Sequence, residues 1–158
     1  MRLPLLELRR VSSGVRADGR RPIRTPTDAA RVLGPLVRGL DVEVALVMPL
    51  DARHRPIGIV EVARGGSNVV HIAAREVFRV AIYAGASALV FTHNHPAGDV
   101  TPSHDDALLT SKLKEAGTLV GVPMLDHVIL SDSRWYSFTE GCSGVWAVEQ
   151  QDAAAAGA

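Results

Sequence analysis

The sequence predicts a single mixed α/β domain, in which strand-like and helix-like segments alternate. Its 158 residues suit one hydrophobic core, and no internal repeat or clear boundary divides them. The run ASALVFT at residues 86–92 is apolar throughout, which is typical of a central strand buried on both faces. A polar loop and then a segment with strong helix signals follow this run directly.

Three segments have the signals of helices. Residues 25–37 begin with Thr25 as the N-cap, and a proline takes the first helical position. Residues 72–86 have helical periodicity with a glycine near the end. Residues 103–121 have the best start, because Ser103 is a good N-cap and two aspartates lie in the first turn, near the positive end of the helix.

The remaining periodic segments have the patterns of strands. Residues 41–50 carry apolar, β-branched side chains at alternate positions and pair through a turn with residues 57–65. We also predict strands at residues 4–13, 86–92, 122–130 and 134–138, the last two joined by the turn SDS.

Charge is distributed unevenly along the chain. The net charge is zero, yet residues 1–38 hold nine arginines against three acidic residues. A basic arm of this kind is able to bind nucleic-acid phosphates. The alternative is a solvated face that binds nothing.

Nothing in the sequence indicates a membrane or a secreted protein. No apolar segment approaches the roughly 18 residues that a spanning helix needs, and the N-terminus lacks the features of a signal peptide. The single cysteine, Cys142, cannot form an internal disulfide, and no local feature would activate it as a nucleophile. We therefore expect a cytoplasmic protein without membrane partners.

The loop after the apolar strand carries the residues with the clearest chemistry. His93 and His95 are two positions apart, so on an extended segment both imidazoles point to the same side. Asp106 lies in the first turn of the following helix and can converge with them on one cation. Two imidazoles and a carboxylate suit Zn²⁺ and leave a fourth position for water, the arrangement of catalytic sites. The alternative is a polar loop whose histidines only cap strand and helix ends.

The segment HNHPAGDVTPSHDD resembles the JAMM metal motif of the JAB/MPN fold, in which His-x-His-Pro is followed by a turn and Ser-x-x-Asp. The spacing from His95 to Ser103 and on to Asp106 matches the motif. More narrowly, the loop and the segments AREVF, LDHVIL and WYSF resemble the RadC-type branch. Asn94, where many proteolytic members have serine or threonine, is typical of that branch.

The resemblance implies a cytidine-deaminase-like mixed β-sheet flanked by helices. It places the RadC-like JAB/MPN domain at residues 26–140. Residues 1–25 are then a basic N-terminal strand or arm. Residues 141–158 are a C-terminal tail, which we predict to be partly disordered because its end is low in complexity.

The JAMM pattern also implies a glutamate upstream of the histidines, on a strand beside the metal. Glu43 stands 50 positions before His93, which fits the pattern. Glu61 is the second candidate, and for either residue the alternative is a solvent-facing position on an edge strand. Glu76 lies in a helical segment, where we expect it to pair with an arginine or with solvent.

The resemblance implies a zinc metallopeptidase or isopeptidase with a peptide or protein substrate. Glu43 would move the proton of the attacking water, and Ser103 would donate a hydrogen bond to the oxyanion or act only as the helix N-cap. The residues alone would support any water-activating hydrolase. Asp126 and His127 recur in the RadC-type pattern and are candidates for contacting a metal ligand or for the pocket wall. For His127, the alternative is a satisfied core histidine.

Two other function classes compete with this interpretation. The letters H-N-H suggest a nuclease, but in those enzymes the named residues are spread over a ββα finger and are not consecutive. A RadC-like protein that associates with DNA and has a non-proteolytic role is the main alternative, with the arginines of residues 1–38 meeting phosphates. Metal content and the salt dependence of DNA affinity separate the two classes.

Overall fold

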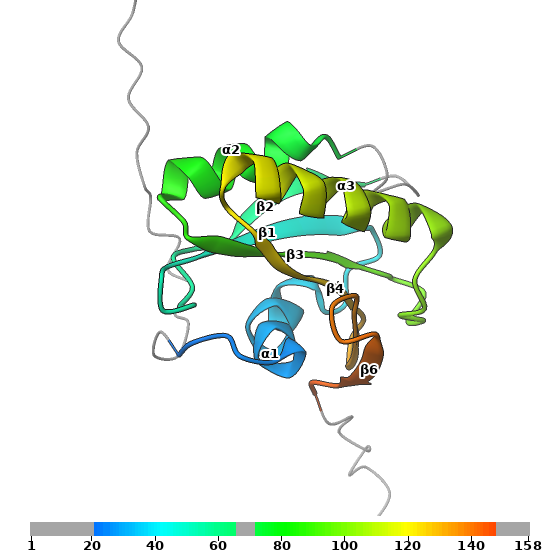
Figure 1. Cartoon of the computed structure of the whole chain (residues 1–158). Helices are drawn as coiled ribbons and strands as arrows, with labels where there is room; N and C mark the ends of the chain where they lie inside the picture. Colours follow the sequence, from blue (N-terminus) through cyan, green and yellow to red (C-terminus); the bar gives the residue numbers. More distant parts are fainter. Residues whose placement is uncertain (1–20, 66–71, 148–158) are drawn as a thin grey trace, which may run out of the picture.

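The computed structural model describes residues 21–65 and 72–147, which form a six-stranded mixed sheet with helices on both faces (Figure 1). The order across the sheet is β2-β1-β3-β4-β5-β6; β3 and β4 are parallel, and all other neighbours are antiparallel. The strands are β1 (Val44–Leu50), β2 (Val60–Arg64), β3 (Ala88–Asn94), β4 (Met124–Leu130), β5 (Arg134–Ser137) and β6 (Cys142–Val145). The predicted single α/β domain is thereby confirmed.

Three helices cover the two faces of the sheet. Helix α1 (Pro26–Val37) packs on one face, and α2 (Ala74–Ala84) and α3 (His104–Val120) lie together on the other (Figure 1). The central strands β1 and β3 therefore contribute alternate side chains to two separate hydrophobic clusters, one under α1 and one under α2 and α3. This double cover explains why all seven residues of β1, VALVMPL, are buried and apolar.

The helix ends follow the predicted chemistry. Thr25 and Ser103 are N-caps, and each forms a reciprocal capping box with an aspartate three residues later. Gly85 and Gly121 end α2 and α3 in the left-handed conformation, with φ of 63° and 75°. These local signals set the direction in which the chain enters and leaves the helices.

Two boundaries differ from the sequence prediction. Strand β3 continues through His93 and Asn94, so the loop begins only at His95. The predicted strand at residues 134–138 is not the last one, because β6 pairs with β5 at the edge of the sheet. The other predictions for the chain ends, a strand at residues 4–13 and a disordered end of the tail, lie outside the described residues.

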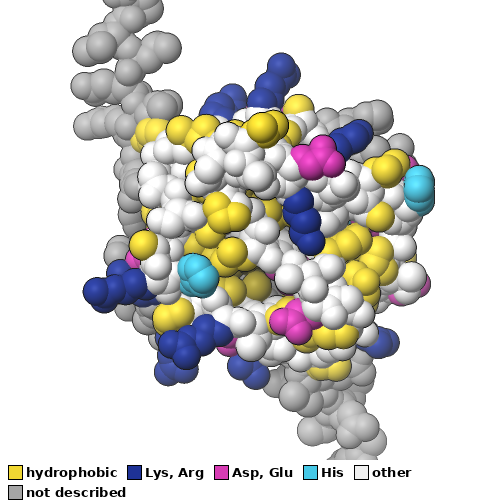
Figure 2. Space-filling view, viewed as in Figure 1, with side chains coloured by type: hydrophobic (Ala, Val, Ile, Leu, Met, Phe, Trp, Pro, Cys, Tyr) yellow, Lys and Arg dark blue, Asp and Glu magenta, His cyan; other side chains and the backbone are white. Residues whose placement is uncertain are grey.

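The described surface is mixed in character. On the face shown in Figure 2, hydrophobic side chains are interspersed with Lys, Arg, Asp and Glu side chains. Among the helices of residues 21–65 and 72–147, none is both long enough and apolar enough to pass through a bilayer.

Candidate metal centre

The two histidines of the motif come from the carboxyl end of β3. His93 is the sixth residue of this central strand and is only 1% exposed, because it faces the α2–α3 side between β1 and β4. His95 lies just beyond the strand end, where its backbone N–H donates to the Leu130 carbonyl at 2.8 Å. The strand therefore presents one buried and one half-buried imidazole to the same side.

Asp106 reaches the histidines from the first turn of α3. The Asp106 Oδ2 atom accepts hydrogen bonds from the Ser103 backbone N–H (2.8 Å) and the Ser103 hydroxyl (2.6 Å), and the Asp106 N–H donates back to Ser103 Oγ at 3.1 Å. This capping box holds one carboxylate oxygen and leaves Oδ1 facing His93. The same contacts that start the helix thus orient the carboxylate.

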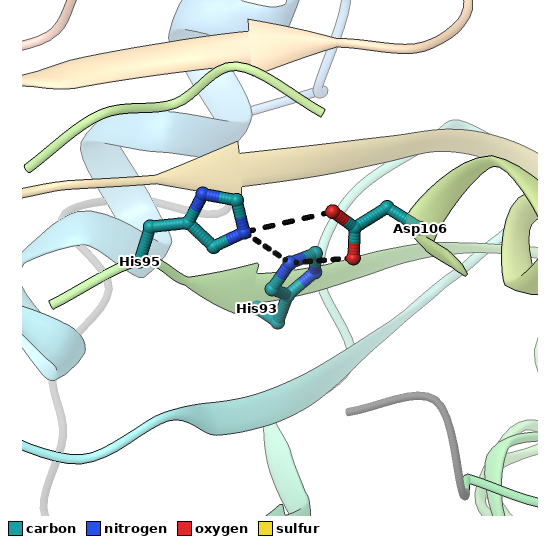
Figure 3. Close-up of side chains that lie close together, drawn as sticks. All are labelled: His93, His95 and Asp106. Atoms are coloured by element: carbon teal, nitrogen blue, oxygen red, sulfur yellow. Dashed lines mark hydrogen bonds and ion pairs between the residues drawn. The ribbon is translucent and has the colours of Figure 1, made fainter. Parts of the chain in front are cut away.

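The donor atoms of the three side chains form a compact triangle (Figure 3). His93 Nε2 lies 3.0 Å from His95 Nε2 and 3.1 Å from Asp106 Oδ1, and His95 Nε2 lies 3.6 Å from Asp106 Oδ2. Zinc with bond lengths of about 2.0–2.1 Å holds tetrahedral ligands about 3.3–3.4 Å apart. The three side chains offer one ligand atom each and could hold a metal ion.

The tautomer of His95 suits a metal ligand. His95 Nδ1 lies 2.7 Å from the carbonyl oxygen of Asp99, which can only accept a hydrogen bond, so Nδ1 carries a proton. In the neutral ring the lone pair is then on Nε2, the atom that faces His93 and Asp106. The loop carbonyl therefore selects the nitrogen that is free to bind a cation.

The charges of the cluster shift its pKa values in opposite directions. Burial alone would raise the pKa of Asp106, but the interactions with His93 and His95 outweigh burial and hold this pKa well below its usual value. The interaction with Asp106 raises the pKa of His95 against the effect of burial, and the negative charge of Glu43 adds to the increase. A negative carboxylate is therefore available to a cation over the whole ordinary pH range.

Glu43 lies immediately before β1, next to the cluster. Its backbone carbonyl accepts from the Gly65 N–H at 2.9 Å, and its side chain is partly exposed. The Asn94 side chain bonds the backbone on both sides of Glu43: its Oδ1 accepts from the Val44 N–H (2.6 Å), and its Nδ2 donates to the Val42 carbonyl (3.0 Å). Strand β3, which carries His93, thus uses its residue Asn94 to hold the segment that contains Glu43.

His127 of β4 is completely buried and touches the cluster directly. Its Nε2 lies 2.8 Å from His93 Nδ1, and its Nδ1 lies 2.6 Å from the hydroxyl of Thr110. Burial lowers the pKa of His127 well below its usual value and so disfavours a charge on this ring. The structure thus brings His127 to a candidate ligand, one of the two arrangements expected for it.

Asp126 does not join the site, which corrects the prediction that paired it with His127. Adjacent residues of a strand point to opposite faces, and Asp126 lies on the α1 side. There it accepts from the Ser137 hydroxyl at 2.6 Å and the Thr139 N–H at 3.0 Å, beside a cavity of about 350 Å³. Its role in the described structure is to hold the turn after β5.

The two other candidate glutamates are paired elsewhere. Glu61 is exposed on the edge strand β2 and forms an ion pair of 2.7 Å with Arg64. Glu76 lies in α2 and pairs with Arg75 and Arg79 at 3.1 and 2.7 Å, as expected. Glu43, in contrast, lies close enough to the cluster for its charge to raise the pKa of His95.

Sequence reasoning missed two residues that contact this site, Asn94 and Thr110. Thr110 stands four positions after Asp106, so the two lie on the same face of a helix, and this spacing was a readable signal. For Asn94 no signal existed, because its partners Val42 and Val44 are 52 and 50 positions away in the sequence and meet it only through strand pairing. Such contacts depend on the register of β1 against β3.

A mixed sheet with one helix on one face and two on the other, carrying His-x-His at a strand end and an aspartate at a helix start, defines a JAB/MPN-type domain with a possible site for a metal ion. The chain belongs to the RadC-like JAB domain family, whose sequence model matches residues 23–144.

Curated relatives are similar to this chain over most of its length. A UPF0758 protein of Clostridium perfringens is 39% identical over 118 residues, which are 75% of this chain and 52% of the relative. A UPF0758 protein of Salinibacter ruber is 39% identical over 132 residues, 84% of this chain and 57% of the relative. A UPF0758 protein of Staphylococcus aureus is 37% identical over 128 residues, which are 80% of this chain and 59% of the relative. The chain thus spans little more than half the length of these relatives.

Proposed function

We propose that this chain is a zinc-dependent hydrolase of the JAMM type that cleaves a peptide or isopeptide bond. The observation that carries the proposal is the convergence of His93 Nε2, His95 Nε2 and the Asp106 carboxylate, with separations of 3.0–3.6 Å. Three protein ligands leave one tetrahedral position open, as in catalytic zinc sites. Membership of the RadC-like JAB domain family supports the same assignment.

His93, His95 and Asp106 would hold the ion. When bound, zinc lowers the pKa of a water molecule toward about 7 and polarises a carbonyl group. The site suits this chemistry because the strand buries His93, whereas His95 remains 18% exposed and leaves an approach from solvent.

Glu43 is the proposed general base and acid. It accepts a proton from the attacking water as the oxygen–carbon bond forms, and it returns the proton to the nitrogen as the carbon–nitrogen bond breaks. Its effect on the pKa of His95 supports a position near the reacting atoms. The Asn94 hydrogen bonds on both sides of Glu43 support a defined place for its backbone.

Ser103 is the proposed donor to the oxyanion. In the structure its single hydroxyl proton is directed to Asp106 Oδ2, and the residue acts as the helix N-cap. The proposed reaction needs this proton to turn toward the substrate oxygen as negative charge develops there. Because Ser103 is exposed, a substrate is able to reach the hydroxyl.

The first experiment measures zinc per chain by elemental mass spectrometry, on the 158-residue chain purified without a metal-binding tag. We expect near-stoichiometric zinc in the wild type and in Glu43→Gln, and its loss in His95→Ala. A wild-type protein that retains no zinc after incubation with zinc and removal of the excess would overturn the proposal.

The second experiment tests hydrolysis with a proteome-derived peptide library and isopeptide-linked peptides, with cleavage read by mass spectrometry. We expect cleavage by the zinc-loaded wild type and none by Glu43→Gln, which keeps the metal ligands and differs only in proton transfer. Equal cleavage by both proteins would exclude Glu43 as the base. Zinc-loaded wild type that cleaves neither kind of bond would contradict the hydrolase assignment.

A further inference from the structure

A pocket of about 420 Å³ lies beside the loop that follows His95. Its walls are residues 98–102 of that loop together with Arg134, Tyr136 and Ser143 of the strands β5 and β6. The loop also contacts the candidate metal centre, because the Asp99 carbonyl oxygen lies 2.7 Å from His95 Nδ1. The pocket and the metal centre therefore share this loop.

The pairing of the strands places the pocket on the face of the sheet that carries the metal centre. His93 pairs with Ile129 of β4, which in turn pairs with Tyr136 of β5. Tyr136 pairs with Ser143 of β6. Paired residues of neighbouring strands point to the same face, so these residues form one row across the sheet. Neighbouring strands are about 4.8 Å apart, which puts Tyr136 about 10 Å from His93 along the row.

Arg134 lies at the end of the sheet where the candidate ligands are. Leu130 pairs with Trp135, and its carbonyl accepts from the His95 N–H at 2.8 Å, so β5 begins level with His95. Trp135 belongs to the hydrophobic cluster under α1. Adjacent residues of a strand point to opposite faces, so Arg134 and Tyr136 both point to the face of the metal centre.

Arg134 brings a positive charge to this pocket that no neighbour neutralises by pairing. The residue is exposed and takes part in none of the ion pairs that join residues 21–65 and 72–147. Asp99, the acidic residue of the pocket wall, directs its Oδ1 atom to Thr101 instead, accepting from the N–H at 2.9 Å and from the hydroxyl at 2.7 Å. The guanidinium fork of arginine matches a carboxylate, and the hydroxyls of Tyr136 and Ser143 are further donors for its oxygen atoms.

We propose that this pocket binds a carboxylate group of the substrate peptide, and that Arg134 determines this specificity. The inference rests on the proposed function, because it names the substrate class of that same site. An extended peptide advances about 3.3 Å per residue, so about 10 Å corresponds to about three residues. The carboxylate therefore stands within about three residues of the cleaved bond, as an acidic side chain or as the C-terminus of the peptide.

The first test measures peptide binding to the metal-free 158-residue chain, so it needs neither zinc nor hydrolysis. One probe is an acetylated and amidated alanine peptide with a central glutamate, and its control has glutamine at that position. A third peptide, of alanine only, is acetylated and ends in a free carboxylate. Changes in ¹H–¹⁵N spectra at the backbone of Gly98, Thr101 and Ser143 report binding.

We expect at least one of the two peptides with a carboxylate to bind about 10-fold more tightly than the glutamine peptide, because a hydrogen bond to a charged group is worth at least 1.5 kcal/mol. Tighter binding of the glutamate peptide identifies a side chain as the source of the carboxylate, and tighter binding of the free acid identifies a C-terminus. Equal binding of all three peptides, or binding that leaves the pocket signals unchanged, would overturn the inference.

The second test reverses the charge. We expect Arg134→Glu to lose the preference for a carboxylate and to bind a peptide with a central lysine more tightly than the wild type does. Arg53→Glu makes the same change of charge in the exposed turn after β1, at the opposite end of the sheet, and should bind like the wild type. If Arg134→Glu keeps the preference for a carboxylate, Arg134 does not determine it.

The two proposals fail in distinguishable ways. A wild type that binds the carboxylate peptide but retains no zinc would remove the proposed hydrolase and leave a peptide-binding pocket. A zinc-loaded wild type that cleaves peptides, with no preference for a carboxylate at a fixed distance from the cut, would leave the hydrolase and remove only the role of Arg134.

Discussion

Asn94 shows how a single side chain can join two parts of the candidate site. It lies between the two candidate histidine ligands, yet its side chain turns to the neighbouring strand and bonds the backbone at Val42 and Val44. It is only 2% exposed, and its hydrogen bonds to Val44 and Val42 are buried and partly buried, respectively. The residue that departs from the serine or threonine of many proteolytic members therefore has a structural reason to be an amide, which both donates and accepts.

We expect Asn94→Ala to loosen the segment that carries Glu43 while leaving the metal ligands in place. Removing the Asn94 amide leaves the Val44 N–H and the Val42 carbonyl without this partner. We expect this to lower the free energy of unfolding by about 1–3 kcal/mol. Amide hydrogen exchange at residues 42–44 should become faster, and zinc content should stay at the wild-type level. Thr139→Ala, which removes one exposed hydroxyl that donates to the Leu125 carbonyl away from residues 42–44, is the control. Unchanged exchange at residues 42–44 would show that Asn94 does not hold this segment.

The ion pair of His95 and Asp106 predicts a pH dependence for the metal-free protein. The pKa of His95 is raised above 6.5, so its stabilising contribution is complete below that value and is lost as pH rises through the folded-state pKa. The pKa of Asp106 is lowered below 3.8, so its contribution is present above that value and is lost as pH falls. The pair should therefore stabilise the fold most between about pH 4 and 6.5.

Urea unfolding with a chelator present tests this window, through the difference in free energy of unfolding between wild type and Asp106→Asn. We expect this difference to shrink from about pH 6.5 upward. A difference that stays constant or grows from pH 6 to 9 would contradict the assignment. Zinc binding should show the opposite trend and weaken toward acidic pH, because protons compete for the same nitrogen atoms.

At the scale of elements, α3 combines structural and chemical roles on one buried face. Its first two turns bury Asp106 and Thr110 beside the histidines, and along its length the helix also buries Leu109, Leu113 and Gly117. Because Asp106 and Thr110 on this buried face are polar, the apolar periodicity of the helix is weak. Its start was nevertheless predictable, because Ser103 and Asp106 form a capping box within four consecutive residues.

Strand β6 illustrates an element that sequence patterns did not reveal. Its residues CSGV show no alternation of apolar and polar side chains, and none of them is fully buried. The strand is held instead by pairing with β5 and by the approach of Gly144 to the ring of Trp135. A Cβ atom at Gly144 would lie 2.6 Å from Trp135 Cζ2, closer than any normal contact.

We therefore expect Gly144→Ala to destabilise the protein by about 1–3 kcal/mol, the usual cost of overpacking. The buried Trp135 ring would have to move, or β6 would have to detach from β5. Urea unfolding provides the measurement, and Ser143→Ala, an exposed neighbour in the same strand, is the control. Equal stabilities of the two variants would show that the ring has room to adapt.

At the scale of the whole molecule, the charge distribution bears on the alternative of DNA association. Lys and Arg side chains in Figure 2 lie at separate places around the face that it shows, intermixed with acidic and apolar ones. The concentration of arginines is a property of residues 1–38, of which only 21–38 lie in the described part. A role in DNA binding would therefore depend mainly on the N-terminal sequence.

We expect the 158-residue chain to bind duplex DNA only in the non-specific range, with a Kd of about 10⁻⁴–10⁻⁶ M at physiological salt. Fluorescence anisotropy with a labelled duplex at several salt concentrations measures both the affinity and its salt slope. Alanine in place of Arg9, Arg10, Arg20 and Arg21 should flatten the slope. Nanomolar binding that depends on these arginines would instead favour the DNA-associated alternative.

The sequence by itself determined the features that depend on neighbouring residues. The helix caps, the glycines that end α2 and α3, the buried run of β3 and the spacing of His93, His95, Ser103 and Asp106 are local patterns, and each has a physical signature within a few positions. The resemblance to the RadC-type branch rests on the same local motifs. The family and the fold class could therefore be predicted, and both are confirmed.

Only the tertiary structure decided which distant side chains meet. The register of β3 against β4 brings His127 to His93 and turns Asp126 to the opposite face, and the register against β1 brings Asn94 to the segment of Glu43. A one-residue slip in either register would exchange the two faces and dismantle these contacts. Register is set by the packing of both hydrophobic clusters together, which no single stretch of sequence contains.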